Sequence, residues 1–115
     1  MYDAAADIGG QFHIAASIAG KEEFRETIRY FRVMLRKAGV TLHLGRMLGP
    51  GDVAELRGAD EVVLASGVAP RALTFPGADH PKVLGYLDVL RHRREVGRRV
   101  AIIGAGGIGF DVAEF

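Results

Sequence analysis

Hydrophobic residues recur at helical spacing between residues 22 and 38. They are separated by four, three and four positions, which places them on one face of an amphipathic helix: Phe24, Ile28, Phe31 and Leu35. Glu22 and Glu23 stand in the first turn and basic residues in the last, an order that suits the helix dipole. Gly39 follows, where helix C-termini favour glycine. The pattern predicts a helix over 22–38 that ends at Gly39.

Other apolar segments follow the patterns of strands. Residues 40–44 alternate between apolar side chains and polar or small ones, as a half-buried strand does. Residues 61–67 predict a second strand, which ends in small residues, and 83–84 a short third one. Residues 100–103 are a continuous apolar run, typical of a strand covered on both faces of a parallel sheet. Residues 86–91 suffice for about one and a half helical turns, so the whole pattern predicts an α/β fold.

Three glycines follow the apolar run at 100–103 with the spacing G-x-G-x-x-G. Gly104 permits a tight turn, Gly106 lets the backbone approach a pyrophosphate, and Gly109 lets the next helix pack closely. Apolar residues then recur on one face of that helix: Ile108, Val112 and Phe115. Strand, glycine turn and helix together predict a dinucleotide-binding turn. The alternative is a glycine-rich turn that binds nothing.

The expected nucleotide-binding unit extends past both ends of this sequence. An acid that binds a ribose is expected about 20 residues after the glycine turn, but the sequence ends six residues after Gly109. Asp3 has the place of such an acid at the end of a strand, unless it is an ordinary surface residue. We therefore expect an α/β, partial Rossmann-like dinucleotide-binding fold truncated at both ends, which the resemblance described below identifies as an FAD/NAD(P)-binding fold. Residues 96–115, with an unpaired strand, are then expected to fray or to mediate self-association.

Composition excludes several functional classes. The net charge of +1 offers no general attraction for nucleic acid, and no apolar run approaches the roughly 18 residues of a membrane span. The absence of cysteine excludes disulfides and any thiolate-bound metal or iron–sulfur cluster on this chain. The four histidines have no spacing of metal ligands. With no signal segment at the N-terminus, a cytoplasmic setting fits best.

A basic cluster precedes the glycine turn. It is either a solvated face of a linker or a patch that steers a phosphate, and it consists of Arg91, His92, Arg93, Arg94, Arg98 and Arg99.

Six segments carry a resemblance to a known family: residues 8–12, 20–24, 39–42, 64–71, 80–90 and 100–115. The pattern A-[ST]-G-x-x-P-R, here from Ala65 to Arg71, occurs in many flavoproteins that have two dinucleotide sites. With the run at 80–90 and the sequence Gly-Gly-Ile-Gly-Phe-Asp at 106–111, the chain resembles the bacterial NADPH-dependent 2,4-dienoyl-CoA reductases in their FAD- and NADPH-binding part. Trimethylamine dehydrogenase and its relatives share the architecture more distantly.

The resemblance implies a large flavoenzyme. An N-terminal barrel would hold FMN and an iron–sulfur cluster, followed by an FAD domain with an inserted NADPH domain. It assigns 1–73 to part of the FAD-binding domain, 74–82 to a connector and 83–115 to the start of the NADPH-binding domain. The catalytic Tyr and His and the cluster cysteines of the family lie in its barrel, so we expect no catalytic residue and no metal ligand here.

The resemblance also implies roles for individual residues. Asp3, eight residues before Gln11, would bind the adenosine ribose of FAD. Gln11 would hydrogen-bond the flavin or its ribityl chain, and Lys21 would offset pyrophosphate charge. The backbone of Leu48, where the family often has Val, would read the adenine edge. The remaining expected contacts are Ala65, Ser66 and Gly67 with FAD, and Gly104, Gly106, Gly107 and Gly109 with NADPH.

The function expected from this resemblance is that of an oxidoreductase segment. Hydride would pass from NADPH to FAD and the electrons on to 2,4-dienoyl-CoA in fatty-acid β-oxidation, with the remainder of the flavoenzyme as partner. The preference for NADPH over NADH rests on the resemblance. Two alternatives stay open: a stand-alone module that binds or senses NAD(P) without redox chemistry, and an inert structural fragment.

Overall fold

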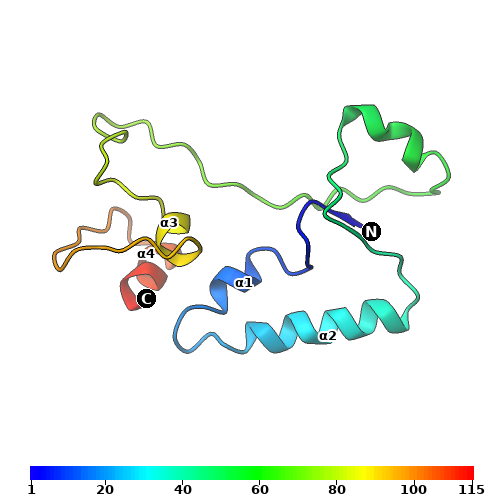
Figure 1. The fold of residues 1–115 in the computed structure, drawn as a ribbon, viewed down its shortest axis with the longest axis horizontal. Helices are drawn as coiled ribbons and strands as arrows, with labels where there is room; N and C mark the ends of the chain where they lie inside the picture. Colours follow the sequence, from blue (N-terminus) through cyan, green and yellow to red (C-terminus); the bar gives the residue numbers. More distant parts are fainter. The chain divides into compact units, whose positions relative to one another are not determined.

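The structure is a computed structural model that describes all residues, Met1–Phe115. Its elements in chain order are β1 (Tyr2–Asp3), α1 (Phe12–Ala15), α2 (Phe24–Lys37), β2 (His43–Leu44), the 3₁₀ helix η1 (Pro50–Leu56), α3 (Tyr86–Leu90) and α4 (Gly107–Glu114), as Figure 1 shows. The chain divides into two compact units. Unit 1 comprises Met1–Gly10 and Glu26–Ala69, and unit 2 comprises Gln11–Arg25 and Pro70–Phe115.

Unit 1 contains a small parallel sheet. β1 pairs with β2 in parallel, with Tyr2 opposite His43 and Asp3 opposite Leu44. The rings of Tyr2 and His43 stack with their centroids 4.4 Å apart. α2 lies between the two strands in the sequence, as the crossover of a βαβ connection does. The predicted α/β character is therefore present, and Asp3 stands at the end of a strand as expected.

Helix α2 confirms the clearest sequence prediction. It runs over Phe24–Lys37, and Ile28 from its apolar face is buried. The helix ends as predicted at Gly39, whose φ of +69° is in the left-handed region that suits glycine. The Gly39 amide donates to the Arg36 carbonyl at 3.1 Å and the Val40 amide to the Leu35 carbonyl at 3.0 Å, the two bonds of a Schellman motif.

The start of α2 lies two residues later than the predicted 22, because Glu22 closes the preceding turn. Its carboxylate accepts a hydrogen bond from the Gly20 amide at 3.2 Å. Hydrogen bonds from the amides of Glu22 itself and of Gly20 hold the pKa of this exposed carboxyl below its ordinary value of 4.5. Glu22 therefore acts before the first helical turn and not within it.

Unit 2 contains the short helices α1, α3 and α4 around a small apolar core. Its buried residues are Ala16, Ile18, Val89 and Leu90. α3 contacts α4 and is preceded by its N-cap residue Gly85, whose amide donates to the Asp88 carboxylate at 2.8 Å. That bond satisfies one of the amides left free at a helix start. α3 thus confirms the helical turn predicted at 86–91, which ends at Leu90.

Three predicted strands are absent. Residues 61–67, 83–84 and 100–103 form no strand, and the strand predicted at 40–44 is reduced to His43–Leu44. A strand is defined by a hydrogen-bonded neighbour, and these segments pair with no other part of the chain. The apolar side chains of 61–67 and 100–103 are consequently exposed, with Val63 exposed by 86%, Leu64 by 89% and Ile103 by 81%, whereas those at 83–84 are half-buried.

The division into units does not follow the predicted domain boundaries. It groups Gln11–Arg25 with the C-terminal half of the chain, whereas the prediction places all of 1–73 in the FAD-binding domain. The assignment of 1–73, 74–82 and 83–115 stays a prediction. No helix in the structure is both long and apolar enough to span a membrane.

Candidate dinucleotide-binding site

The glycine turn predicted from the sequence leads directly into helix α4. Gly104 has φ of +113°, a conformation that side chains strongly disfavour. Gly106 is the extended residue before the helix, with φ of −86° and ψ of 179°, and α4 begins at Gly107. The Phe110 amide donates to the Gly106 carbonyl at 3.2 Å, which closes the first turn. The turn and helix of the predicted motif are therefore confirmed, while the strand before them is not.

Gly109 is the most constrained glycine of the turn. A Cβ atom at this position would overlap the Gly104 carbonyl oxygen and would lie 3.1 Å from its carbon and 3.8 Å from Cγ2 of Ile102. The helix thus crosses the backbone of the turn at a distance that only glycine permits. This is the role that the motif spacing predicts for the third glycine.

Gly106 and Gly107 border open space. A Cβ at either position would meet no atom within 4 Å. The first amides of α4 have no acceptor within the helix and lie at its positive end. A phosphate group can therefore approach this backbone closely, and side chains on these glycines would occupy the same space. The geometry fits the pyrophosphate of a dinucleotide.

The apolar face predicted for α4 is only partly covered. Val112 is half-buried, but Ile108 is 51% exposed and Phe115 41% exposed. Ile108 and Phe115 are exposed because no sheet lies under this face of the helix. The Phe115 ring instead lies against the Arg93 guanidinium, 4.4 Å from its centroid, in a cation–π contact.

Asp111, on the second turn of α4, forms an ion pair with Lys21. The Lys21 ammonium donates to Oδ1 of Asp111, and the two side chains are 38% and 22% exposed. The resemblance implies that Lys21 contacts FAD and gives Asp111 no role. The signal that could have identified Asp111 is its place as a carboxylate two residues after the last glycine of the motif.

Asp3 lies at the end of β1 and is half-buried. Its Oδ1 accepts a hydrogen bond from the Ala5 amide at 2.8 Å, and its backbone carbonyl accepts one from the Arg46 amide at 2.9 Å. The local backbone thereby orients the carboxylate. A carboxylate fixed at the end of a parallel strand suits a ribose contact, and its role stays a prediction.

Gln11 and Leu48 each lie just before a helix. The Gln11 carbonyl accepts hydrogen bonds from the Ile14 and Ala15 amides, both at 3.0 Å, and so begins α1. Leu48 is half-buried and precedes Gly49, whose amide donates to the Asp52 carboxylate at 2.7 Å at the start of η1. Neither geometry tests the predicted cofactor contact.

The predicted site residues fall into the two units. Gln11, Lys21 and the glycine turn belong to unit 2, whereas Asp3, Leu48 and 65–67 belong to unit 1. Ala65, Ser66 and Gly67 are exposed, and Gly67 has φ of +75°, so it too occupies a conformation that favours glycine. The contacts predicted for Ala65, Ser66 and Gly67 with FAD stay predictions.

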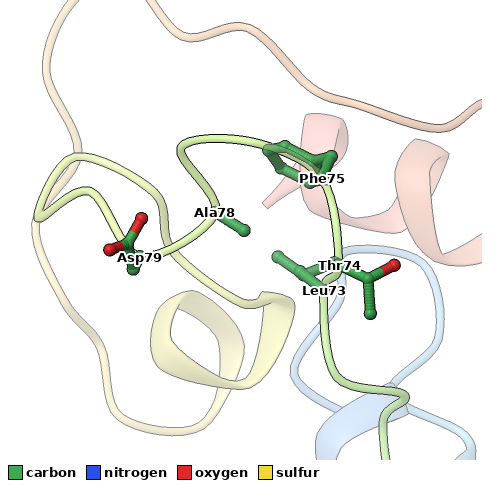
Figure 2. Close-up of a pocket in the computed structure, with 5 residues that line it drawn as sticks. All are labelled: Leu73, Thr74, Phe75, Ala78 and Asp79. Carbon is green, nitrogen blue, oxygen red and sulfur yellow. The ribbon is translucent and has the colours of Figure 1, made fainter.

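An open hollow lies where the predicted FAD-binding segment passes into the predicted connector. Its lining consists of Leu73, Thr74, Phe75, Ala78 and Asp79, and Figure 2 shows the side chains of Leu73 and Ala78 directed toward each other. The lining contains no cation that would bind a phosphate, and it contains none of the predicted site residues. The structure contains no group of three or more residues that could hold a metal ion.

Comparison with known proteins places the chain in a family. The family model described as pyridine nucleotide-disulphide oxidoreductase matches residues 3–115. The chain is 40% identical over 93 residues, or 81% of its length, to a cinnamate reductase of Clostridium sporogenes. It is 28% identical over 99% of its length to a bilirubin reductase of Mediterraneibacter gnavus. It is 32% identical over 89% of its length to an N,N-dimethylglycine/sarcosine dehydrogenase of Chromohalobacter salexigens.

The chain spans 14%, 18% and 15% of the lengths of these three relatives, respectively. The match to the family model, by contrast, covers nearly the whole chain and includes the glycine turn and Asp3. The chain belongs to the pyridine nucleotide-disulphide oxidoreductase family, flavin-dependent oxidoreductases that bind FAD and pyridine nucleotides.

Proposed function

We propose that this chain forms the part of an NADPH-dependent flavoenzyme through which electrons enter. In this proposal the glycine turn at 104–109 binds NADPH, while Asp3, Gln11, Leu48 and 65–67 contact FAD. When bound, the two cofactors supply hydride donor and hydride acceptor. The chain's own residues bind and orient them.

The observation that carries the proposal is the geometry at Gly109 and Gly106. The backbone at Gly109 is too close to Gly104 for any side chain, and the backbone at Gly106 is open to a ligand. A glycine turn that binds nothing has no need for both features at the spacing of the dinucleotide motif. Membership of a family that binds FAD and pyridine nucleotides supports the same assignment.

The identity of the electron acceptor is the most specific part of the proposal. The resemblance to 2,4-dienoyl-CoA reductases favours a dienoyl-CoA, in an enzyme that also holds FMN and an iron–sulfur cluster outside this chain. The relatives named cinnamate reductase and bilirubin reductase favour a reductase but not one particular substrate. We propose 2,4-dienoyl-CoA as the first acceptor to test, with cinnamate and bilirubin beside it.

The proposal is tested on the full-length protein purified without added cofactor. We expect FAD to be released on denaturation, and bound FAD to be reduced when NADPH is added without oxygen. Oxidised flavin should return on addition of one of the three acceptors. NADH, added in a matched experiment, tests the preference for NADPH.

The alternatives predict different results. A module that senses NAD(P) without redox chemistry would bind NADPH, as followed by quenching of nicotinamide fluorescence, and would release no flavin. An inert structural segment would bind neither cofactor. Either outcome would contradict the proposed function.

A further inference from the structure

An ion pair joins two segments of unit 2 that are far apart in the sequence. Lys21 lies 90 positions before Asp111, and its ammonium donates to the Asp111 carboxylate. The two side chains are 38% and 22% exposed, so both charges are partly withdrawn from water. Attraction between such charges is screened less by salt than attraction across an open surface.

The Lys21 side of the pair is fixed through its backbone. The Lys21 amide donates to the Ile18 carbonyl at 3.1 Å, and the Lys21 carbonyl accepts from the Phe24 amide at 3.2 Å. Ile18 is only 1% exposed, which anchors this turn in the core of unit 2. The ammonium therefore extends from a defined position on the chain.

Asp111 lies on helix α4, which makes few other contacts with the rest of unit 2. α4 has eight residues, too few to be stable as an isolated helix. The apolar run at 100–103 before it forms no sheet, and Ile108 and Phe110 on its surface are 51% and 64% exposed. Besides the backbone of the glycine turn, the contacts that orient α4 are its contact with α3, the contact of Phe115 with Arg93 and the ion pair at Asp111.

We infer that Lys21 is a positioning residue for the dinucleotide turn. Through Asp111 it holds α4 so that the amides that follow Gly106 face the pyrophosphate of the pyridine nucleotide. This inference rests on the proposed function, because it takes the glycine turn as the NADPH site. It differs from the role implied by the resemblance, in which Lys21 offsets the charge of the FAD pyrophosphate.

The two roles for Lys21 predict different losses. If Lys21 acts through Asp111, removal of either charge weakens NADPH binding by the same amount. If Lys21 contacts FAD directly, Lys21→Met releases FAD while Asp111→Asn leaves it bound. A double variant distinguishes coupled from independent effects, because the losses of NADPH affinity caused by substituting the two residues of one ion pair do not add.

The experiment uses the full-length protein and the single variants Lys21→Met and Asp111→Asn with their double variant. The Kd for NADPH is taken from the concentration dependence of flavin reduction, and FAD per chain from the absorbance of denatured samples. We expect each single variant to raise this Kd about threefold to fivefold, as for a partly exposed ion pair. The double variant should bind NADPH no more weakly than either single variant. The limiting rate of flavin reduction and the FAD content should not change.

Conservative variants and a matched control separate positioning from folding. Lys21→Arg and Asp111→Glu keep the charges and should retain most of the NADPH affinity. Glu114→Gln removes an exposed carboxylate from the same helix and should leave the affinity unchanged. If Asp111→Asn does not fold, the comparison of Lys21→Met with Lys21→Arg gives the same information.

Three results would overturn the inference and leave the proposed function standing. These are FAD loss in Lys21→Met alone, an unchanged Kd for NADPH in both single variants, and an equal effect of Glu114→Gln. If the unsubstituted protein binds no NADPH, the inference and the proposed function both fail.

Discussion

Gly109 shows how a single residue links the sequence to the site. The spacing of the motif predicts that a helix passes close to the turn here, and the structure places the Gly104 carbonyl where a Cβ would be. The requirement is steric and needs no knowledge of the ligand. At Gly106 the requirement depends on the ligand, because the structure itself would accept a larger side chain there.

Asp3 provides a prediction for FAD. We expect Asp3→Ala in the full-length protein to weaken FAD binding by at least about tenfold, because a carboxylate bound to ribose hydroxyls contributes roughly 1.5 to 3 kcal/mol. Equilibrium dialysis followed by flavin absorbance measures the change. Asp60→Ala, at an exposed position, is the matched control. Unchanged FAD retention in Asp3→Ala would remove this residue from the site.

Glu22 provides a prediction for pH dependence. Amide hydrogen bonds from Glu22 and Gly20 favour its ionised form, so its pKa in the folded chain lies below 4.5. Its contribution to stability is therefore complete above the unfolded pKa and is lost as the pH falls through the folded pKa. Carboxyl-carbon NMR titration should show the lowered value, and Glu22→Gln should reduce the stability lost on acidification. A Glu22 pKa at or above 4.5 would contradict the hydrogen-bonded turn.

Among the elements, the glycine turn and α4 give the clearest prediction for NADPH. We expect Gly106→Val to abolish NADPH-driven reduction of the flavin while FAD stays bound, because two methyl groups would fill the space that a pyrophosphate needs. Stopped-flow reduction by NADPH and FAD content are the two measurements. Gly58→Val, at a glycine that also borders open space, is the control. Reduction at the unsubstituted rate in Gly106→Val would exclude this turn as the nucleotide site.

The elements also show which parts of the fold the sequence can predict. Helix α2 is predictable because its period, its end charges and Gly39 are all local signals, and its Schellman bonds join residues within one turn. The strand expected at 100–103 requires hydrogen-bonded neighbouring strands, and the local sequence pattern does not reveal whether such strands are present. Lys21 illustrates the same limit in the site, because its pairing with Asp111 joins residues 90 positions apart.

The apolar run at 100–103 gives a prediction for the 115-residue polypeptide. Its amides have no ladder partner and its side chains are largely exposed, whereas α2 is hydrogen-bonded along its length. Hydrogen exchange on a dilute sample should therefore show faster exchange at 100–103 than in α2. Protection that rises with protein concentration would indicate strand pairing between chains. Strong protection at low concentration would contradict the structure of this segment.

At the scale of the whole molecule, two units with small cores carry residues assigned to two cofactors. The buried side chains are Ile8 and Ile28 in unit 1 and Ala16, Ile18, Val89 and Leu90 in unit 2. The chain spans at most 18% of the length of the relatives reported above. The activity proposed is therefore that of a larger enzyme, and the role proposed for this chain within it is nucleotide binding.

Anaerobic titration of the full-length protein with NADPH tests the central proposal most directly. We expect the absorbance of bound FAD to bleach as NADPH is added, with the end point set by the number of redox centres. The bleaching should be lost in Gly106→Val and kept in Gly58→Val. A protein that holds no flavin, or a bound flavin that stays oxidised in excess NADPH, would contradict the proposed path of hydride from NADPH to FAD.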